Sequence, residues 1–132
     1  MPAKKQLSPH KHREIVYGAK QQYAHVESAS PSLDEKGVQR VQEIMGSCLF
    51  YGRAVDNKLL VAINTISSQQ AHATEDTNKA ITTLLDYLAT YPDNGILYRA
   101  SDMILAAHSN AGFHNETKGR SRARAHIILV RK

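Results

Sequence analysis

Aromatic residues are scarce in this chain, and tryptophan is absent. Phenylalanine and tyrosine make up only 6% of the residues, so the core has to form from aliphatic side chains and low stability is expected. The single cysteine, Cys48, excludes an internal disulfide and is typical of a reducing compartment. No apolar run approaches the roughly 20 residues of a membrane span, and the N-terminal residues lack the apolar stretch of a secretory signal. We therefore expect an intracellular protein, cytoplasmic or nuclear, that is neither secreted nor in contact with a membrane.

Positive charge is concentrated at the two ends of the chain. Residues 1–20 carry a net charge of +4 and residues 118–132 carry +6, whereas residues 21–117 carry −5. Basic ends of this kind can contact a polyanion, and RNA, DNA or an RNA–DNA hybrid would then be the partner. The alternative interpretation is that the charged ends are only solvated and keep a weakly stable domain in solution.

The residue patterns divide the chain into three regions. Residues 1–32 contain scattered prolines and serines without a sustained hydrophobic period, which is typical of a flexible arm, here a basic one. Residues 33–95 have apolar side chains at steps of three and four, which predicts helices. Residues 96–132 contain short apolar runs that predict strands.

Three helices are predicted in the central region. The apolar stripes and the turn signal after Pro92 place them at residues 34–55, 57–70 and 75–91. Gly46, in the first of them, is the residue we expect to permit close helix packing. The expected N-caps are Asp34, Asp56 and Thr74.

The C-terminal region predicts a small antiparallel sheet of three strands. The strands are expected at residues 96–100, 103–108 and 126–130, with a tight turn at Ser101 and Asp102 joining the first two. The last run is nearly all β-branched or leucine, as in a buried strand. The predicted fold class is therefore α+β, a three-helix group followed by a small antiparallel sheet. Because residues 127–130 would form an unprotected strand edge, self-association through that edge is expected.

Familiar catalytic and metal-binding patterns are not found. The seven histidines do not reproduce the spacing of a structural zinc site, and Cys48 lies on the apolar stripe of a helix without a ligand partner. Ser109 follows His108 in the sequence, but members of a catalytic triad meet through the fold. The glycines match neither a phosphate-binding loop nor a dinucleotide fingerprint. No metal ion or cofactor is therefore expected.

Several segments in a particular order resemble one known family. Residues 108–113 (HSNAGF) follow an apolar strand, and the basic loop at residues 118–124 (KGRSRAR) leads into another. This layout resembles the first strands of the ribonuclease H domain in copia-type retrotransposon Pol polyproteins. Upstream, the matching segments resemble the thumb or connection region that follows the reverse transcriptase palm; they are residues 16–19, 38–46, 49–56 and 71–92. The similarity covers most of residues 16–130.

The resemblance implies an origin more clearly than an activity. In the family, the first ribonuclease H strand ends in an aspartate that holds catalytic metal, and here that position is Asn110. Two-metal hydrolysis needs several carboxylates around Mg²⁺, and the family's remaining ones would lie beyond residue 132. The polymerase aspartates would lie before Met1. Neither enzyme activity is expected, and Mg²⁺ would be expected only in an intact family member.

Two functions remain open on this basis, with a third that is least favoured. The first is a truncated, non-catalytic remnant of a transposable element. The second is a module that binds nucleic acid without reading its sequence, through the basic arm and the loop residues Lys118, Arg120, Arg122 and Arg124, whose arginine forks suit phosphate oxygens. Tyr51, Tyr98 and Phe113 could add base stacking, although aromatics at apolar spacing usually belong to a core. A metal-dependent nuclease assembled with a partner chain is the least favoured.

Overall fold

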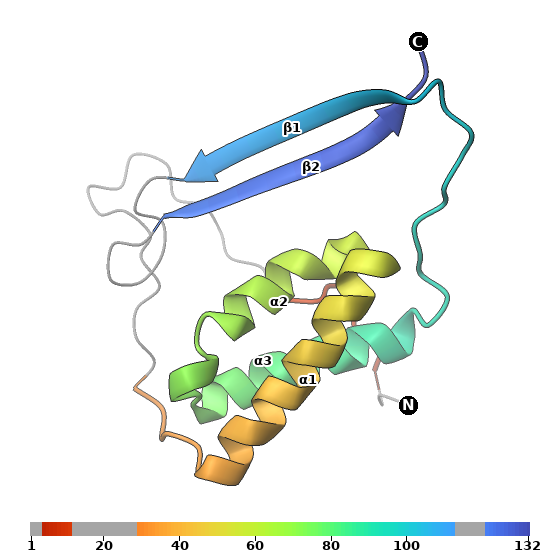
Figure 1. Cartoon of the computed structure of the whole chain (residues 1–132). Coiled ribbons are helices and arrows are strands. Elements are labelled where there is room, and N and C mark those ends of the chain that lie inside the picture. The colour runs from red at the N-terminus through yellow and green to blue at the C-terminus, as the bar shows by residue number, and fades with distance from the viewer. Residues whose placement is uncertain (1–3, 12–28, 113–120) are drawn as a thin grey trace, which may run out of the picture. The chain divides into compact units, whose positions relative to one another are not determined.

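The computed structural model of the chain describes residues 4–11, 29–112 and 121–132. These residues divide into a helical unit, residues 4–11 and 29–96, and a hairpin unit, residues 97–112 and 121–132 (Figure 1). The helical unit contains three α-helices and the hairpin unit two antiparallel strands, which confirms the predicted α+β class. Among the described helices, none combines the length and the apolar character that crossing a bilayer requires.

Helix α1 spans Glu35–Ala54 and begins where its sequence predicts. An Asp34 carboxylate oxygen accepts a hydrogen bond from the Gly37 N–H at 2.8 Å and so satisfies one of the free donors of the first turn. Glu35 adds a negative charge near the positive end of the helix dipole. The buried face of α1 is formed by Val41, Met45, Cys48 and Gly52.

The second helix is shorter than predicted, and a 3-10 turn stands on either side of it. A 3-10 turn, η1, spans Asn57–Leu59, helix α2 spans Leu60–Ser67, and another 3-10 turn, η2, spans Gln70–His72. The Ser68 hydroxyl donates to the Thr65 carbonyl at 2.7 Å, and side-chain bonds of this kind compete with a continuing helix. Asp56 caps η1, with Oδ1 accepting the Lys58 N–H at 3.1 Å. The buried Oδ2 of Asp56 has no hydrogen-bond partner among the described residues.

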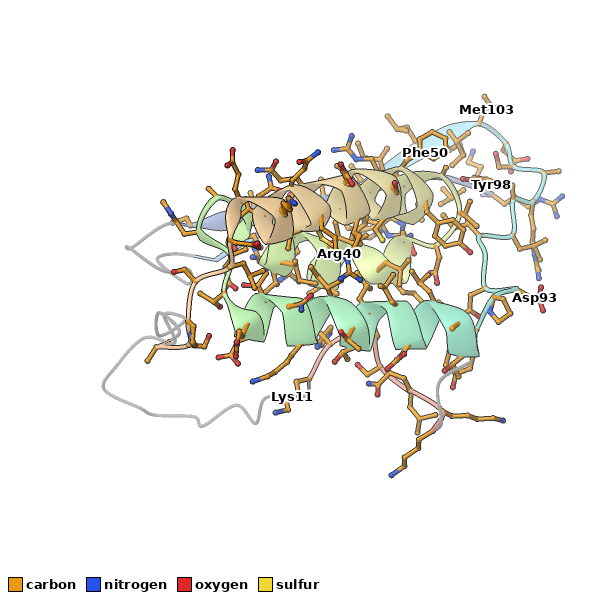
Figure 2. All side chains as sticks on the ribbon, turned by 90° about the horizontal axis from the view of Figure 1, so that it is seen from below. Lys11, Arg40, Phe50, Asp93, Tyr98 and Met103 are labelled. Carbon is orange, nitrogen blue, oxygen red and sulfur yellow. The ribbon has the colours of Figure 1, made fainter. Side chains whose placement is uncertain are left out.

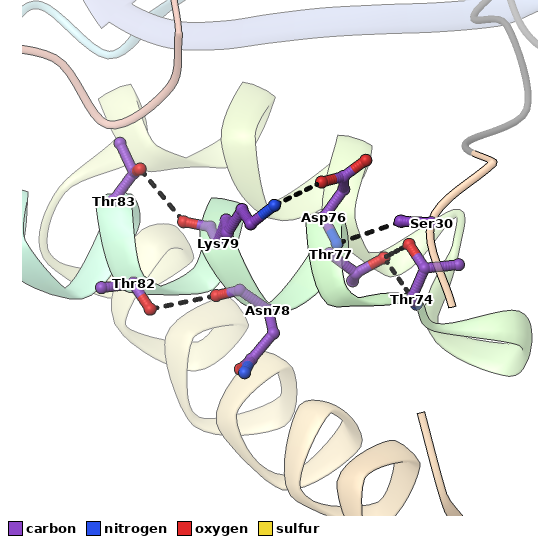
Figure 3. Close-up of polar contacts among 8 residues, drawn as sticks. All are labelled: Ser30, Thr74, Asp76, Thr77, Asn78, Lys79, Thr82 and Thr83. Carbon is purple, nitrogen blue, oxygen red and sulfur yellow. Dashed lines mark hydrogen bonds and ion pairs between the residues drawn. The ribbon is translucent and has the colours of Figure 1, made fainter. Parts of the chain in front are cut away.

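Helix α3 spans Glu75–Thr90 and starts at the predicted cap, Thr74. The Thr77 hydroxyl accepts the Thr74 N–H at 3.1 Å, and an extended segment at residues 30–33 supplies further partners (Figure 3). The Glu75 N–H donates to the Pro31 carbonyl at 3.1 Å, so the start of the helix is tied to the chain before α1. Of the predicted arm, residues 1–3 and 12–28 lie outside the described residues.

The core of the helical unit is aliphatic, as the composition predicts. Leu59, Ile63 and Leu84 are completely inaccessible to solvent, and tyrosine contributes one buried ring. Figure 2 shows the side chains that fill the space between the helices, whereas Phe50 on α1 is 76% exposed. The complete set of buried apolar residues is Val41, Met45, Cys48, Leu59, Ala62, Ile63, Ile66, Ala73, Ile81, Leu84 and Tyr87.

Close packing between α1 and the segment that follows it depends on Gly52, and the prediction for Gly46 is wrong. A β-carbon at position 52 would lie 2.9 Å from Ile63 Cδ1 and 3.3 Å from Leu60 Cδ2. At position 46 a β-carbon would meet no atom within 4 Å, because that residue is exposed. Both glycines sit on the same helix, but only one of them faces α2.

The two glycines give a matched pair of substitutions. Gly46→Ala is expected to raise the free energy of unfolding by about 0.5–1 kcal/mol, because alanine favours the helix and nothing obstructs it. Gly52→Ala gains the same propensity but crowds the buried Ile63, and overpacking of about 1–3 kcal/mol outweighs that gain. Urea unfolding followed by circular dichroism measures both changes. Equal stabilisation by the two variants would contradict the packing described for Gly52.

The hairpin unit consists of β1, Ile104–Gly112, paired with β2, Arg122–Val130. The strands run antiparallel in a register that places Ile104 opposite Val130, His108 opposite His126 and Gly112 opposite Arg122. The sheet has two strands, so the predicted strand at residues 96–100 is wrong. The two remaining strands are longer than predicted.

The reason for the missing strand lies between residues 101 and 103. Instead of turning back, Asp102 joins the end of β2: its N–H donates to the Val130 carbonyl at 3.3 Å, and its Oδ2 accepts the Lys132 N–H at 2.9 Å. Met103 has a φ of 58°, a left-handed conformation that is unusual outside glycine and redirects the chain into β1. The apolar residues Leu97 and Tyr98 remain 75% and 76% exposed. The expectation of a buried last strand is also wrong, since Ile127 is 63% exposed.

Candidate nucleic-acid interface

The arginine and histidine side chains of the two strands lie on one side of the hairpin, and the half of that side near Ile104 and Val130 is apolar. Alternate residues of a strand point to the same side, and the register places Asn110 opposite Arg124 and His108 opposite His126. Arg122 shares that side, two residues before Arg124. We call this set the basic face: His108, Asn110, Arg122, Arg124 and His126.

The basic face is accessible and contains no acidic side chain. His108, Asn110, Arg124 and His126 are exposed, and Arg122 is half-buried. Neither strand contains an aspartate or glutamate. Among the described residues, the acid closest in sequence to the strands is Asp102, and its carboxylate accepts a hydrogen bond from the Lys132 N–H. The strand residues of this face therefore contribute the positive charge of two guanidinium groups.

Of the four residues predicted to bind nucleic acid, two are among the described residues. Arg122 and Arg124 lie on β2 and share the basic face, although the sequence suggested that they belong to a loop. Lys118 and Arg120 lie outside the described residues. The sequence contained a signal that was missed: Arg122, Arg124 and His126 alternate with alanines, which is the two-residue period of a strand.

The position that resembles a metal-binding aspartate does not fit a divalent cation. Asn110 offers a neutral amide oxygen, and its cross-strand neighbour is the cation Arg124. Mg²⁺ prefers carboxylate oxygens, and an adjacent guanidinium would repel it. Within residues 4–11, 29–112 and 121–132, no three histidine, cysteine, aspartate or glutamate side chains gather as a metal site requires.

The other side chains considered from the sequence belong to the helical unit or stand apart from the basic face. Cys48 is buried on α1, and burial raises the pKa of its thiol, which disfavours the nucleophilic thiolate. Tyr51 is half-buried, and its hydroxyl donates to the Asn94 carbonyl at 3.2 Å. Tyr98 is exposed and precedes β1, whereas Phe113 lies outside the described residues.

Comparison with known proteins finds no relative of this chain. No family model matches the chain, and no curated protein or solved structure matches it either. The chemistry of the hairpin therefore has to be argued from its own residues.

Proposed function

We propose that this chain is a non-catalytic relative of copia-type Pol polyproteins that binds nucleic-acid backbones without reading base sequence. The observation that carries the proposal is the basic face, where two arginines share one side of a strand and no acid lies on either strand. An intracellular location, cytoplasmic or nuclear, is part of the proposal. The proposal also includes the absence of a catalytic metal, because Asn110 stands at the position where the family has a metal-binding aspartate.

The spacing of the two arginines suits a repeating anion. Residues two apart on a strand are separated by about 6.7 Å, so Arg122 and Arg124 can each engage a different phosphate. A guanidinium fork binds phosphate oxygens with two parallel hydrogen bonds. Asn110, His108 and His126 add polar groups beside them that can contact sugar and phosphate. Contacts of this kind position a duplex but do not distinguish one base pair from another.

Binding of the full chain to an RNA–DNA hybrid across a salt series tests the proposal. Each phosphate neutralised releases counterions, so two arginine contacts give a slope of about −2 in a plot of log K against log salt concentration. The same slope is expected with unrelated hybrid sequences. A folded chain that ignores the hybrid at low salt would leave only the alternative, an inert remnant of a transposable element.

A substitution that adds a negative charge at Asn110 tests whether the basic face contacts the nucleic acid. Asn110→Asp places a carboxylate opposite Arg124, where a cross-strand ion pair contributes about 0.2–1 kcal/mol to the hairpin and competes with phosphate. We expect the affinity for the hybrid to fall by roughly 3- to 10-fold at low salt, a loss of about 0.7–1.4 kcal/mol, with no cleavage in Mg²⁺. Ser109→Asp is the control, because it makes the same charge change on the other side of the strand. Losses of equal size would assign the effect to net charge alone.

A further inference from the structure

Two histidines stand opposite each other on the basic face. His108 on β1 is paired with His126 on β2 in the strand register, and both side chains are exposed. Directly opposed residues of an antiparallel pair have β-carbons about 4.5–5.5 Å apart, so the two imidazole rings can contact one phosphate placed between them. We call His108 and His126 the histidine pair.

The histidine pair continues the row of arginines on β2. Arg122, Arg124 and His126 follow one another at steps of two residues, or about 6.7 Å. A phosphate backbone that contacts the two arginines can therefore continue over the histidine pair. Beyond the pair, the same side of the hairpin carries Ala106 opposite Ile128, so the row of polar groups ends there.

The charged groups around the histidine pair come from the two strands and from the residues next to them. Besides the pair itself, the strands contribute only the two cations Arg122 and Arg124. The other charged side chains among the described residues of the hairpin unit are Arg99, Asp102, Arg131 and Lys132. Asp102 is the one acid among them, and its carboxylate accepts the Lys132 N–H. Neither strand therefore offers a carboxylate to a protonated imidazole, and a phosphate can take that role.

Protonation decides how well the histidine pair binds a phosphate. A neutral imidazole has one N–H donor and one lone pair, whereas an imidazolium is positively charged and donates from both ring nitrogens. Charge-assisted hydrogen bonds to phosphate are roughly twice as strong as neutral ones. Two imidazolium groups that face each other repel, and a phosphate between them offsets that repulsion. The protonated pair and the bound phosphate therefore stabilise each other.

We propose that the histidine pair is a proton-dependent phosphate clamp, which makes nucleic-acid binding by the basic face stronger as the pH falls. The inference rests on the proposed function, because the arginines hold the backbone beside the pair. Histidine is the side chain that normally changes its charge between about pH 5 and pH 8. A chain that takes up protons together with the nucleic acid gains affinity as the pH falls and loses it as the pH rises. The arginines keep their charge throughout and supply the contact that remains at the higher pH.

Binding of the full chain to an RNA–DNA hybrid at about pH 8 and about pH 5.5, each across a salt series, tests the proposal. At the higher pH the two arginines give a slope of about −2 in a plot of log K against log salt concentration. At the lower pH the clamp neutralises one more phosphate, so the slope should steepen to about −3 and the affinity at low salt should rise roughly 10-fold. Circular dichroism of the free chain at both pH values checks that it is equally folded.

The contact at the higher pH belongs to the arginines and the gain at the lower pH belongs to the histidine pair, so the two can fail separately. Binding with the same affinity and slope at both pH values would refute the clamp and leave the proposed function supported. An absence of binding at both would refute the clamp together with the proposed function.

Two double variants separate the clamp from the general effect of histidine charge. His108→Gln with His126→Gln removes both imidazoles of the pair, and the gain in affinity at the lower pH should shrink to less than about 3-fold. His10→Gln with His72→Gln is the matched control, since both of these histidines are exposed in the helical unit. In the control the full gain of roughly 10-fold should remain. Equal pH dependence of the two double variants would overturn the proposal.

A double variant with permanent charge tests the clamp in the opposite direction. His108→Lys with His126→Lys carries, already at the higher pH, the charge that the histidines gain only at the lower one. Its affinity at the higher pH should exceed that of the unmodified chain by roughly 10-fold and should change little as the pH falls. Nuclear Overhauser contacts between β1 and β2 report whether the variant keeps the hairpin. An affinity no higher than that of the unmodified chain, with the hairpin intact, would contradict the clamp.

Discussion

Replacing Arg122 and Arg124 together with glutamine is expected to lower the affinity for an RNA–DNA hybrid by roughly 10- to 100-fold at low salt. Both side chains lie on the basic face, and neither strand contains an aspartate or a glutamate. If each arginine engages one phosphate, as proposed, the slope of log K against log salt concentration should become smaller by about 2. Fluorescence anisotropy of a labelled hybrid, titrated at several salt concentrations, measures both quantities.

A second pair of arginines provides the matched control for this experiment. Arg40 and Arg53 are exposed on α1, and Arg53 lies in the last turn of that helix. Replacing both with glutamine removes the same net charge from the chain but leaves the hairpin unchanged. The affinity should fall less than about 3-fold, and the salt slope should stay close to that of the unmodified chain. Equal losses from the two double variants would show that general attraction, and not the basic face, holds the nucleic acid.

Replacing Leu84 with alanine is expected to reduce the free energy of unfolding of the helical unit by about 3–4 kcal/mol. Leu84 is completely buried on α3, and its side chain belongs to the aliphatic core shared by the three helices. Removing it leaves a cavity that the surrounding side chains fill only in part. In a core with few aromatic residues, this loss is a large fraction of the total stability.

The neighbouring residue, Leu85, provides a matched control for the Leu84 substitution. Leu85 is 39% exposed, so Leu85→Ala removes the same atoms from the same helix with the same change in helix propensity. Its expected cost is about 1 kcal/mol or less, since much of that side chain already contacts water. Urea unfolding monitored at the helical circular dichroism band gives both values. A similar cost for the two variants would contradict the side of α3 that is described as facing the core.

The helical unit could be predicted well because its signals are local. Asp34 and Thr74 were recognised as N-caps, and each lies one residue before its helix in the structure. The apolar stripes identified most of the core, including Val41, Met45 and Leu84. The predictions were less successful where neighbouring elements decide the outcome. The close approach at Gly52 depends on Ile63 of another helix, and a one-dimensional pattern does not contain that contact.

The hairpin was harder to predict because strand pairing is not local. Residues 96–100 have the composition of a strand, but Asp102 bonds to the end of β2, and no third strand forms in the described sheet. Arg122 and Arg124 were predicted to bind nucleic acid from their charge alone. That they share one face with His108, His126 and Asn110 follows only from the register of the two strands.

Amide hydrogen exchange of the full chain, with and without a saturating RNA–DNA hybrid, tests the role of the basic face most directly. Peptides from residues 104–112 and 122–130 should exchange more slowly when the hybrid is present, because the phosphates cover one side of the hairpin. Peptides from α1 and α3 should exchange at the same rate in both samples. Slower exchange confined to the helices, or no change anywhere despite binding, would contradict the assignment of nucleic-acid contact to the hairpin.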